Sequence, residues 1–139
     1  MVQSDILAKI NSSQLSVFVV WLPIMDSDSY QHAQQAQALV PDSRTRQLWD
    51  GRLALGQGYR RILPLGAECK VAWDVYLLYR PGGKRFRYTL LESGKKGWIP
   101  PTPDFWMHQL SCMTREQYFD SKILRENIEA MLAWNVAAR

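Results

Sequence analysis

Two acidic residues follow the most apolar stretch of the chain, and this position suggests acid–base or ligand-binding chemistry. Six apolar residues run from Val17 to Leu22, Pro23 ends the run, and Asp26 and Asp28 come soon after it. So short an apolar run predicts a parallel strand buried on both faces. Ligands and catalytic groups collect at the carboxyl end of such a strand, because the chain leaves the sheet there at the start of a helix. Helix capping is the alternative role, since carboxylates stabilise a helix N-terminus by themselves.

A further carboxylate, Asp74, lies within the apolar segment Val71–Tyr79, which predicts a second strand. A charge inside an apolar strand must be paired, bound to a cation or protonated. An edge position or a salt bridge to an arginine would make Asp74 structural. A position facing the turn after Leu22 would make it a functional group.

An aromatic residue and a histidine follow a proline-rich segment. Pro100, Pro101 and Pro103 stiffen the approach to Trp106 and His108. We expect these two residues to lie in a structured loop near the carboxyl end of the Val17–Leu22 strand, where they contribute to a binding surface. In the alternative, the aromatic rings of this segment cover the predicted hairpin as core.

The cysteines and histidines do not form a recognisable metal or redox motif. Cys69 and Cys112 have neither Cys-x-x-Cys nor zinc-finger spacing, so we expect buried or idle thiols. His108 and Cys112 are four residues apart, a spacing at which two ligands share a helix face. Zinc would need at least one more converging ligand, and His32 and Asp26 do not complete a set. We therefore predict no metal site and no cofactor.

The hydrophobic periodicity and the turn residues predict an α/β fold with one mixed sheet and helices on both faces. Gly56 and Gly58 would weaken a helix, so they mark close packing or early fraying. We predict Gly94–Pro103 as a loop. The expected elements are a helix capped by Ser4, the Val17–Leu22 strand, a helix from Asp26–Ser29 to Leu39, an edge strand at 43–49, a helix at Gly51–Leu63, a hairpin of Val71–Tyr79 with Arg85–Leu91, and a helix after a Thr114–Gln117 capping box.

Length and charge limit the classes of protein to consider. The 139 residues fit one domain, residues 1–139, and no apolar run is long enough for a membrane span. The net charge is +4. The basic residues are spread along the chain, and the densest groups lie beside turn signals, as on a solvated hairpin rim. We therefore do not expect nucleic acid as a partner.

A natural start at Met1 would indicate the cytoplasm. The compartment stays open if an export signal has been removed.

The order of elements resembles that of the thioredoxin-like family. Three stretches carry the resemblance: F-V-V-W-L before the first long helix, Y-L-L-Y-R-P-G-G at the second strand and its turn, and S-K-I-L-R-E-N-I-E-A-M-L in the last helix. The resemblance implies a thioredoxin-like mixed sheet with helices on both faces. Redox-active members place Cys-x-x-Cys where this chain has Met25-Asp26-Ser27-Asp28, and the position of their cis-proline falls near Asp74. We therefore expect no thiol-disulfide exchange, unless Cys69 or Cys112 lies within reach.

Two classes of function remain open from the sequence. The first is a redox-inactive thioredoxin-like binding or interaction module, whose partner is an unknown protein or small-molecule ligand. The second is an enzyme that uses Asp26, Asp74 or His108 in acid–base or metal-assisted chemistry, which requires these side chains to converge in a pocket. The candidate ligand-binding residues are Trp21, Pro23, Asp26, Asp28, Trp73, Asp74, Trp106 and His108.

Overall fold

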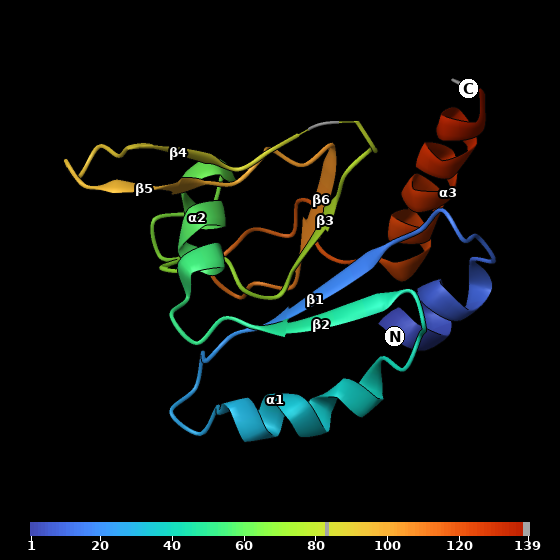
Figure 1. The fold of residues 1–139 in the computed structure, drawn as a ribbon, viewed down its shortest axis with the longest axis horizontal. Helices are drawn as coiled ribbons and strands as arrows, with labels where there is room; N and C mark the ends of the chain where they lie inside the picture. The colour runs from blue at the N-terminus through green and yellow to red at the C-terminus, as the bar shows by residue number, and fades with distance from the viewer. Residues whose placement is uncertain (83, 138–139) are drawn as a thin grey trace. The chain divides into compact units, whose positions relative to one another are not determined.

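The computed structural model describes residues 1–82 and 84–137, and it shows a mixed α/β protein (Figure 1). The chain divides into two compact units. One unit, here called the terminal unit, combines Met1–Arg52 with Phe119–Arg139. The other, the middle unit, is Leu53–Tyr118.

The terminal unit contains a parallel β–α–β arrangement. Strand β1 (Val17–Trp21) pairs in parallel with β2 (Thr45–Trp49), and their register runs from Val17 opposite Thr45 to Trp21 opposite Trp49. Helix α1 (Tyr30–Ala36) and the helical turn η3 (Gln37–Leu39) connect the two strands. The parallel strand and the short second strand are therefore confirmed. Burial on both faces is wrong for β1, because the Phe18 side chain is 60% exposed.

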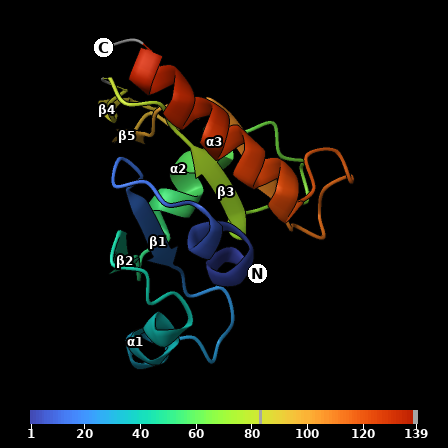
Figure 2. The same cartoon turned by 90° about the vertical axis from the view of Figure 1, so that its right-hand side faces the viewer.

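The two ends of the chain pack together in the same unit. The N-terminal turns η1 (Val2–Ile6) and η2 (Leu7–Lys9) precede β1, and helix α3 (Ser121–Ala137) contacts η1 (Figure 2). Ile6, Leu7 and Ile10 are buried, as their spacing predicts, and so are Leu124 and Ile128 of α3.

Helix α3 begins later than the sequence suggests. The carboxylate of Asp120 accepts hydrogen bonds from the backbone N–H groups of Lys122 (2.8 Å) and Ile123 (3.0 Å). Asp120 therefore caps the helix. The predicted Thr114–Gln117 capping box is wrong, because Gln117 has a left-handed backbone with φ of 57°.

The middle unit contains one helix and two antiparallel strand pairs. Helix α2 (Ala54–Ile62) comes first; β3 (Val75–Leu78) pairs with β6 (Phe105–His108), and β4 (Arg87–Leu90) pairs with β5 (Lys96–Ile99). The predicted hairpin of Val71–Tyr79 with Arg85–Leu91 is therefore wrong. The expected loop at Gly94–Pro103 contains β5 instead.

The single mixed sheet predicted from the sequence is also wrong for the part of the chain that the structure describes. Its strands form three separate two-stranded sheets, so Val17–Leu22 and Val71–Tyr79 belong to different sheets. The apolar patterns located β1 and β3 correctly. They could not identify the partner of each strand, because an alternating or apolar run fits any partner with a suitable face.

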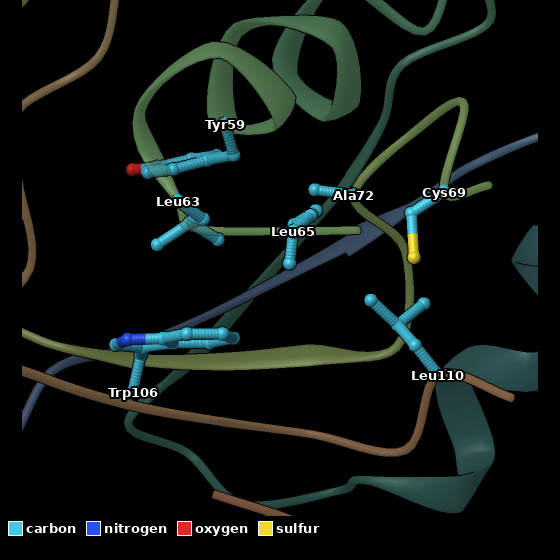
Figure 3. Packing of buried hydrophobic residues seen from close by; sticks show 7 residues of the cluster. All are labelled: Tyr59, Leu63, Leu65, Cys69, Ala72, Trp106 and Leu110. Atoms are coloured by element: carbon cyan, nitrogen blue, oxygen red, sulfur yellow. The ribbon is translucent and has the colours of Figure 1, made fainter. Parts of the chain in front are cut away.

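The core of the middle unit joins α2 to β6. The side chains of Tyr59, Leu63 and Leu65 point toward Trp106 and Leu110, and all five are buried (Figure 3). Gly58 allows α2 to approach the proline segment, since a Cβ at this position would lie 3.1 Å from Pro100. The expectation of close packing is therefore confirmed at Gly58.

Candidate functional site

The turn after β1 holds Asp26 and Asp28, and the structure gives Asp28 a local structural role. The Asp28 carboxylate accepts hydrogen bonds from the backbone N–H groups of Ile24 and Met25, both at 2.8 Å. Ser29, rather than either aspartate, caps α1 by accepting a hydrogen bond from the His32 N–H at 3.2 Å. Asp26 is exposed. Asp28 therefore closes the turn, and the capping interpretation is wrong for both carboxylates.

The other two candidates in this region have ordinary surroundings. The indole N–H of Trp21 donates a hydrogen bond to the side-chain oxygen of Gln47 across the β1–β2 pair at 3.0 Å. Pro23 is half-buried just after the strand. Both residues shape the strand end, and neither adds a reactive group.

Asp74 lies just before β3 rather than inside a strand. Its backbone is left-handed, with φ of 51°, and its carbonyl accepts a hydrogen bond from the Gln109 N–H at 2.9 Å. Partial desolvation raises the pKa of the Asp74 carboxyl, while the Tyr76 hydroxyl, 3.4 Å away, lowers it. The Tyr76 hydroxyl has one proton, and the side-chain oxygen of Gln109, at 2.5 Å, is its nearer acceptor. These groups form a polar cluster at one end of the β3–β6 pair.

The expectation that Trp106 and His108 lie in a loop is wrong, because both belong to β6. His108 is fully buried. Its Nδ1 accepts a hydrogen bond from the Leu110 N–H at 3.1 Å, so Nε2 carries the proton and donates to the Glu116 carbonyl at 2.9 Å. Because both ring nitrogens have backbone partners, His108 is a structural residue.

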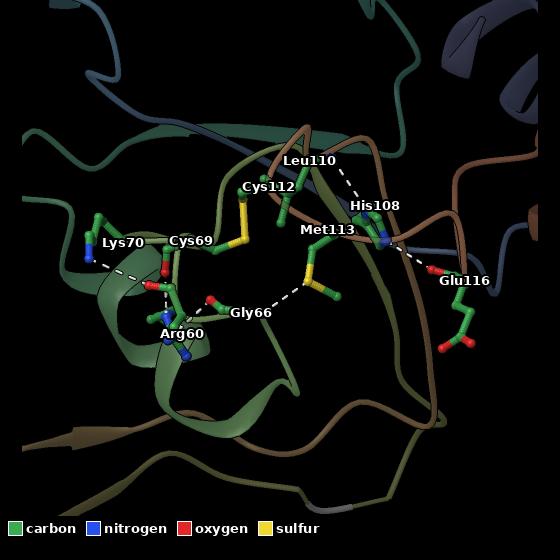
Figure 4. Close-up of a disulfide and its surroundings, with 10 residues drawn as sticks. Arg60, Gly66, Cys69, Lys70, His108, Leu110, Cys112, Met113 and Glu116 are labelled. Carbon is green, nitrogen blue, oxygen red and sulfur yellow. Dashed lines mark hydrogen bonds between the residues drawn. A yellow bond between two sulfur atoms is a disulfide. The ribbon is translucent and has the colours of Figure 1, made fainter.

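The two cysteines form a disulfide, so the expectation of buried or idle thiols is wrong. The Cys69–Cys112 bond connects the segment after α2 to the segment after β6 (Figure 4). Cys69 is 2% exposed and belongs to the core cluster. Nearby, the Gly66 N–H donates to the sulfur of Met113 at 3.1 Å. This environment is that of a structural cross-link, which sequence spacing alone does not reveal.

The structure brings together some of the predicted site residues. Val75, the neighbour of Asp74, is opposite His108 in the β3–β6 pair, so Asp74, Trp106 and His108 belong to one region of the middle unit. Trp73 is 37% exposed beside them. Trp21, Pro23, Asp26 and Asp28 belong to the terminal unit.

A different feature of the middle unit stands out, and the sequence analysis did not select it as a site. Every residue of β4 is exposed. On one face of the β4–β5 hairpin, Tyr88, Leu90 and Trp98 are 56%, 66% and 60% exposed. The rings of Tyr88 and Trp98, which are opposite each other, have centroids 4.9 Å apart. These three residues are called the aromatic face below.

The opposite side of the hairpin is basic. A groove of about 290 Å³ is lined there by Lys84, Arg85, Arg87, Ile99 and Pro100, among others. Lys84 forms an ion pair with Asp104 at 2.7 Å. Within the described chain, Arg85 and Arg87 form no ion pair with an acidic residue, and both are exposed. Arg85 and Arg87 are called the basic face below.

The charge of the whole chain is concentrated in this region. Residues 80–99 hold six of the 17 basic residues and one of the 13 acidic residues, so their net charge of +5 exceeds the +4 of the entire chain. A count of charge by segment could have identified this region from the sequence. From the sequence, the densest basic groups were interpreted as a solvated hairpin rim and not as a site.

The remaining chemistry of the described residues is limited. No group of three or more His, Cys, Asp or Glu side chains among them could hold a metal ion. None of the described helices is long and apolar enough to cross a membrane.

The comparisons with known proteins do not assign the chain to a family. It matches no protein-family model, no curated protein and no solved structure.

Proposed function

We propose that this protein is a redox-inactive binding module that recognises its partner through the β4–β5 hairpin. The observation that carries the proposal is the exposure of β4 at every residue, together with the Tyr88–Trp98 ring pair. A two-stranded hairpin is marginally stable by itself. Exposed apolar groups surrounded by polar residues are typical of interaction sites, and Tyr, Trp and Arg dominate binding energies at such surfaces.

The absence of redox activity is part of the proposal. The Cys69–Cys112 disulfide supports it, because Cys69 is buried and Cys112 is partly buried, whereas thiol exchange needs an accessible sulfur and a reactive thiolate. We expect no reduction of insulin by this protein with dithiothreitol as the electron donor. Turnover that disappears in a Cys69→Ala/Cys112→Ala variant would contradict this part.

A thioredoxin-like origin of the module remains a proposal based on the order of its elements. The parallel β1–α1–β2 unit supports it. The pairing of β3 with β6, in place of the expected hairpin, counts against it.

A photo-crosslinking experiment on the intact chain tests the binding surface. A photoreactive amino acid replaces Tyr88 in one variant and Tyr30 of α1 in the control, since these side chains are 56% and 57% exposed. We expect a discrete adduct with a cellular partner from position 88 that is lost when Trp98→Ala is added. Equal labelling from both positions, or an adduct that does not depend on Trp98, would contradict the proposal.

An enzyme that uses Asp74 is the second candidate. The raised pKa of its carboxyl and its left-handed backbone favour this alternative, because strained residues with shifted pKa values are common at active sites. His108 does not support it, since the ring is buried and both nitrogens are bonded. An Asp74→Asn variant that abolishes a reproducible hydrolytic or isomerase activity of the purified protein would favour the enzyme.

A further inference from the structure

The outer edge of β4 carries backbone groups that are available for pairing. The Leu91 N–H donates to the Lys95 carbonyl at 2.8 Å, and hydrogen-bonded positions alternate along an antiparallel pair. Arg87 and Thr89 therefore direct their backbone groups toward β5. Tyr88 and Leu90 direct theirs away from it, and no strand of the described chain pairs with this edge.

The two sides of this edge differ in chemistry. The aromatic face lies on one side of β4, and Arg87 lies on the other side beside the groove. An added strand would present its side chains alternately to these two sides. In a matching strand, apolar and acidic side chains would therefore alternate. The apolar side chains would contact the aromatic face, and the acidic side chains would contact the basic face.

The same charges disfavour a second copy of this chain as the occupant. Two β4 edges pairing with each other would place two basic segments, each carrying Arg85 and Arg87, side by side, and like charges brought near each other are destabilising. Basic residues on an edge strand are a common device against self-association. An acidic strand on the same edge would instead be attracted by Arg85 and Arg87.

We propose that the partner contributes an extended segment in which acidic and apolar residues alternate, and that this segment adds to the edge of β4. The backbone of Tyr88 and Leu90 bonds to it, Arg85 and Arg87 bind its carboxylates, and the aromatic face covers its apolar side chains. This inference deepens the proposed function and rests on it.

Two other anionic partners would be attracted by the basic face but have no alternation of apolar and acidic groups. A single-stranded nucleic acid would use the cations and stack its bases on the rings, and an anionic membrane would use the cations and bury the apolar side chains. Neither needs the backbone edge or a two-residue period. Both are therefore outcomes of the test.

The test measures the binding of fluorescent peptides to the intact protein by anisotropy. The probe is a short capped peptide in which Glu alternates with Val, and the control peptide has the same composition in two blocks. We expect the alternating peptide to bind about tenfold or more tightly, since only it can satisfy both faces in one register.

Two pairs of variants test the contacts. Arg85→Glu/Arg87→Glu should weaken binding by about tenfold or more, whereas Lys9→Glu/Arg52→Glu, with the same change in net charge on exposed side chains, should leave it unchanged. Leu90→Pro removes an edge N–H that β5 does not use, so it should abolish binding. Leu90→Ala, which removes the apolar side chain alone, should only weaken it.

Several results would overturn the inference. The first is equal affinity for the two peptides, and the second is an equal loss of affinity from both charge-reversal pairs. The third is that the protein binds a single-stranded oligonucleotide or phosphatidylserine vesicles more tightly than the alternating peptide. Absence of peptide binding, together with a Trp98-dependent adduct at position 88, would overturn the acidic strand and leave the binding module intact. Absence of peptide binding together with absence of the adduct would overturn the acidic strand and the binding module.

Discussion

His108 shows how a residue suited to catalysis can serve structure instead. Its imidazole bridges the Leu110 N–H and the Glu116 carbonyl while fully buried. We expect His108→Ala to lower the free energy of unfolding by about 2–4 kcal/mol, because the buried Leu110 N–H and the part-buried Glu116 carbonyl lose their partner and a cavity remains. Thermal or urea unfolding measures this loss.

His32 provides the matched control for that variant. It is exposed on α1, so His32→Ala should change the stability by no more than about 0.5 kcal/mol. If His108→Ala has an unchanged melting temperature and fails to bind the partner, His108 is a binding residue and the structural assignment is wrong.

Asp74 shows what the sequence could not reveal about a single residue. A carboxylate flanked by apolar residues predicted a charge inside a strand. The chain instead places Asp74 in a left-handed conformation directly before β3, where its carboxyl is partly exposed. Asp adopts this conformation more readily than most residues, but the sequence contains no turn signal at this point.

At the scale of elements, Arg44 connects the N-terminal turns to the start of β2. Its guanidinium donates to the carbonyls of Leu7, Ile10 and Ser12 and to the Asp42 carboxylate. We expect Arg44→Lys to lower the free energy of unfolding by about 2 kcal/mol, since an ammonium group cannot reproduce this planar set of bonds. Arg46→Lys, on the exposed side of β2, should be neutral in the same unfolding assay.

The same contact predicts a dependence of stability on pH. The Arg44 side chain and backbone N–H lower the pKa of Asp42 from 3.8 to about 2. A lowered pKa means that the folded state favours the carboxylate, so this stabilisation is present above pH 4 and is lost as the pH falls toward 2. Asp42→Asn should flatten the stability profile in this window, and an unchanged slope would show that the contact is absent in solution.

The elements themselves were partly predictable. The apolar run at Val17–Leu22 and the apolar segment around Val75–Leu78 located β1 and β3, and helical spacing identified the buried residues of α3. Strand β6 was missed because Pro100, Pro101 and Pro103 indicated a loop. These prolines end before Phe105, where the strand begins, and proline is compatible with the start of a strand.

For the molecule as a whole, the disulfide is the constraint that the sequence did not reveal. Cys69 and Cys112 are 43 residues apart, and closing a loop of this length stabilises the folded state by about 4 kcal/mol in the chain-entropy description. We expect reduction, or the Cys69→Ala/Cys112→Ala variant, to lower the melting temperature. A reductant should not affect the variant further, and a wild-type protein that titrates with two free thiols would contradict the bond.

The disulfide also depends on the redox conditions around the protein. Such bonds persist in oxidising compartments and are rare in the cytosol. We therefore expect the Cys69–Cys112 bond to persist under oxidising conditions. Thiol titration of the protein recovered from cells measures the fraction that is oxidised.

The distribution of charge over the whole chain explains why the proposed binding surface was not selected from the sequence. The net charge of +4 for the whole chain is too small to indicate a partner. It does not show that residues 80–99 alone have a net charge of +5. The sequence shows this concentration but not the pairing of β4 with β5, which places Arg87 and the Tyr88–Trp98 ring pair on opposite faces of one hairpin.

The exchange of the β4 amide protons tests the central claim most directly. In the free protein, the Tyr88 and Leu90 amides should exchange rapidly because they point away from β5, while the Arg87 and Thr89 amides should be protected by their bonds to it. Addition of the alternating acidic peptide should protect Tyr88 and Leu90. Protection of these two amides in the free, monomeric protein would show that the edge is already covered, and would contradict the proposed recognition surface.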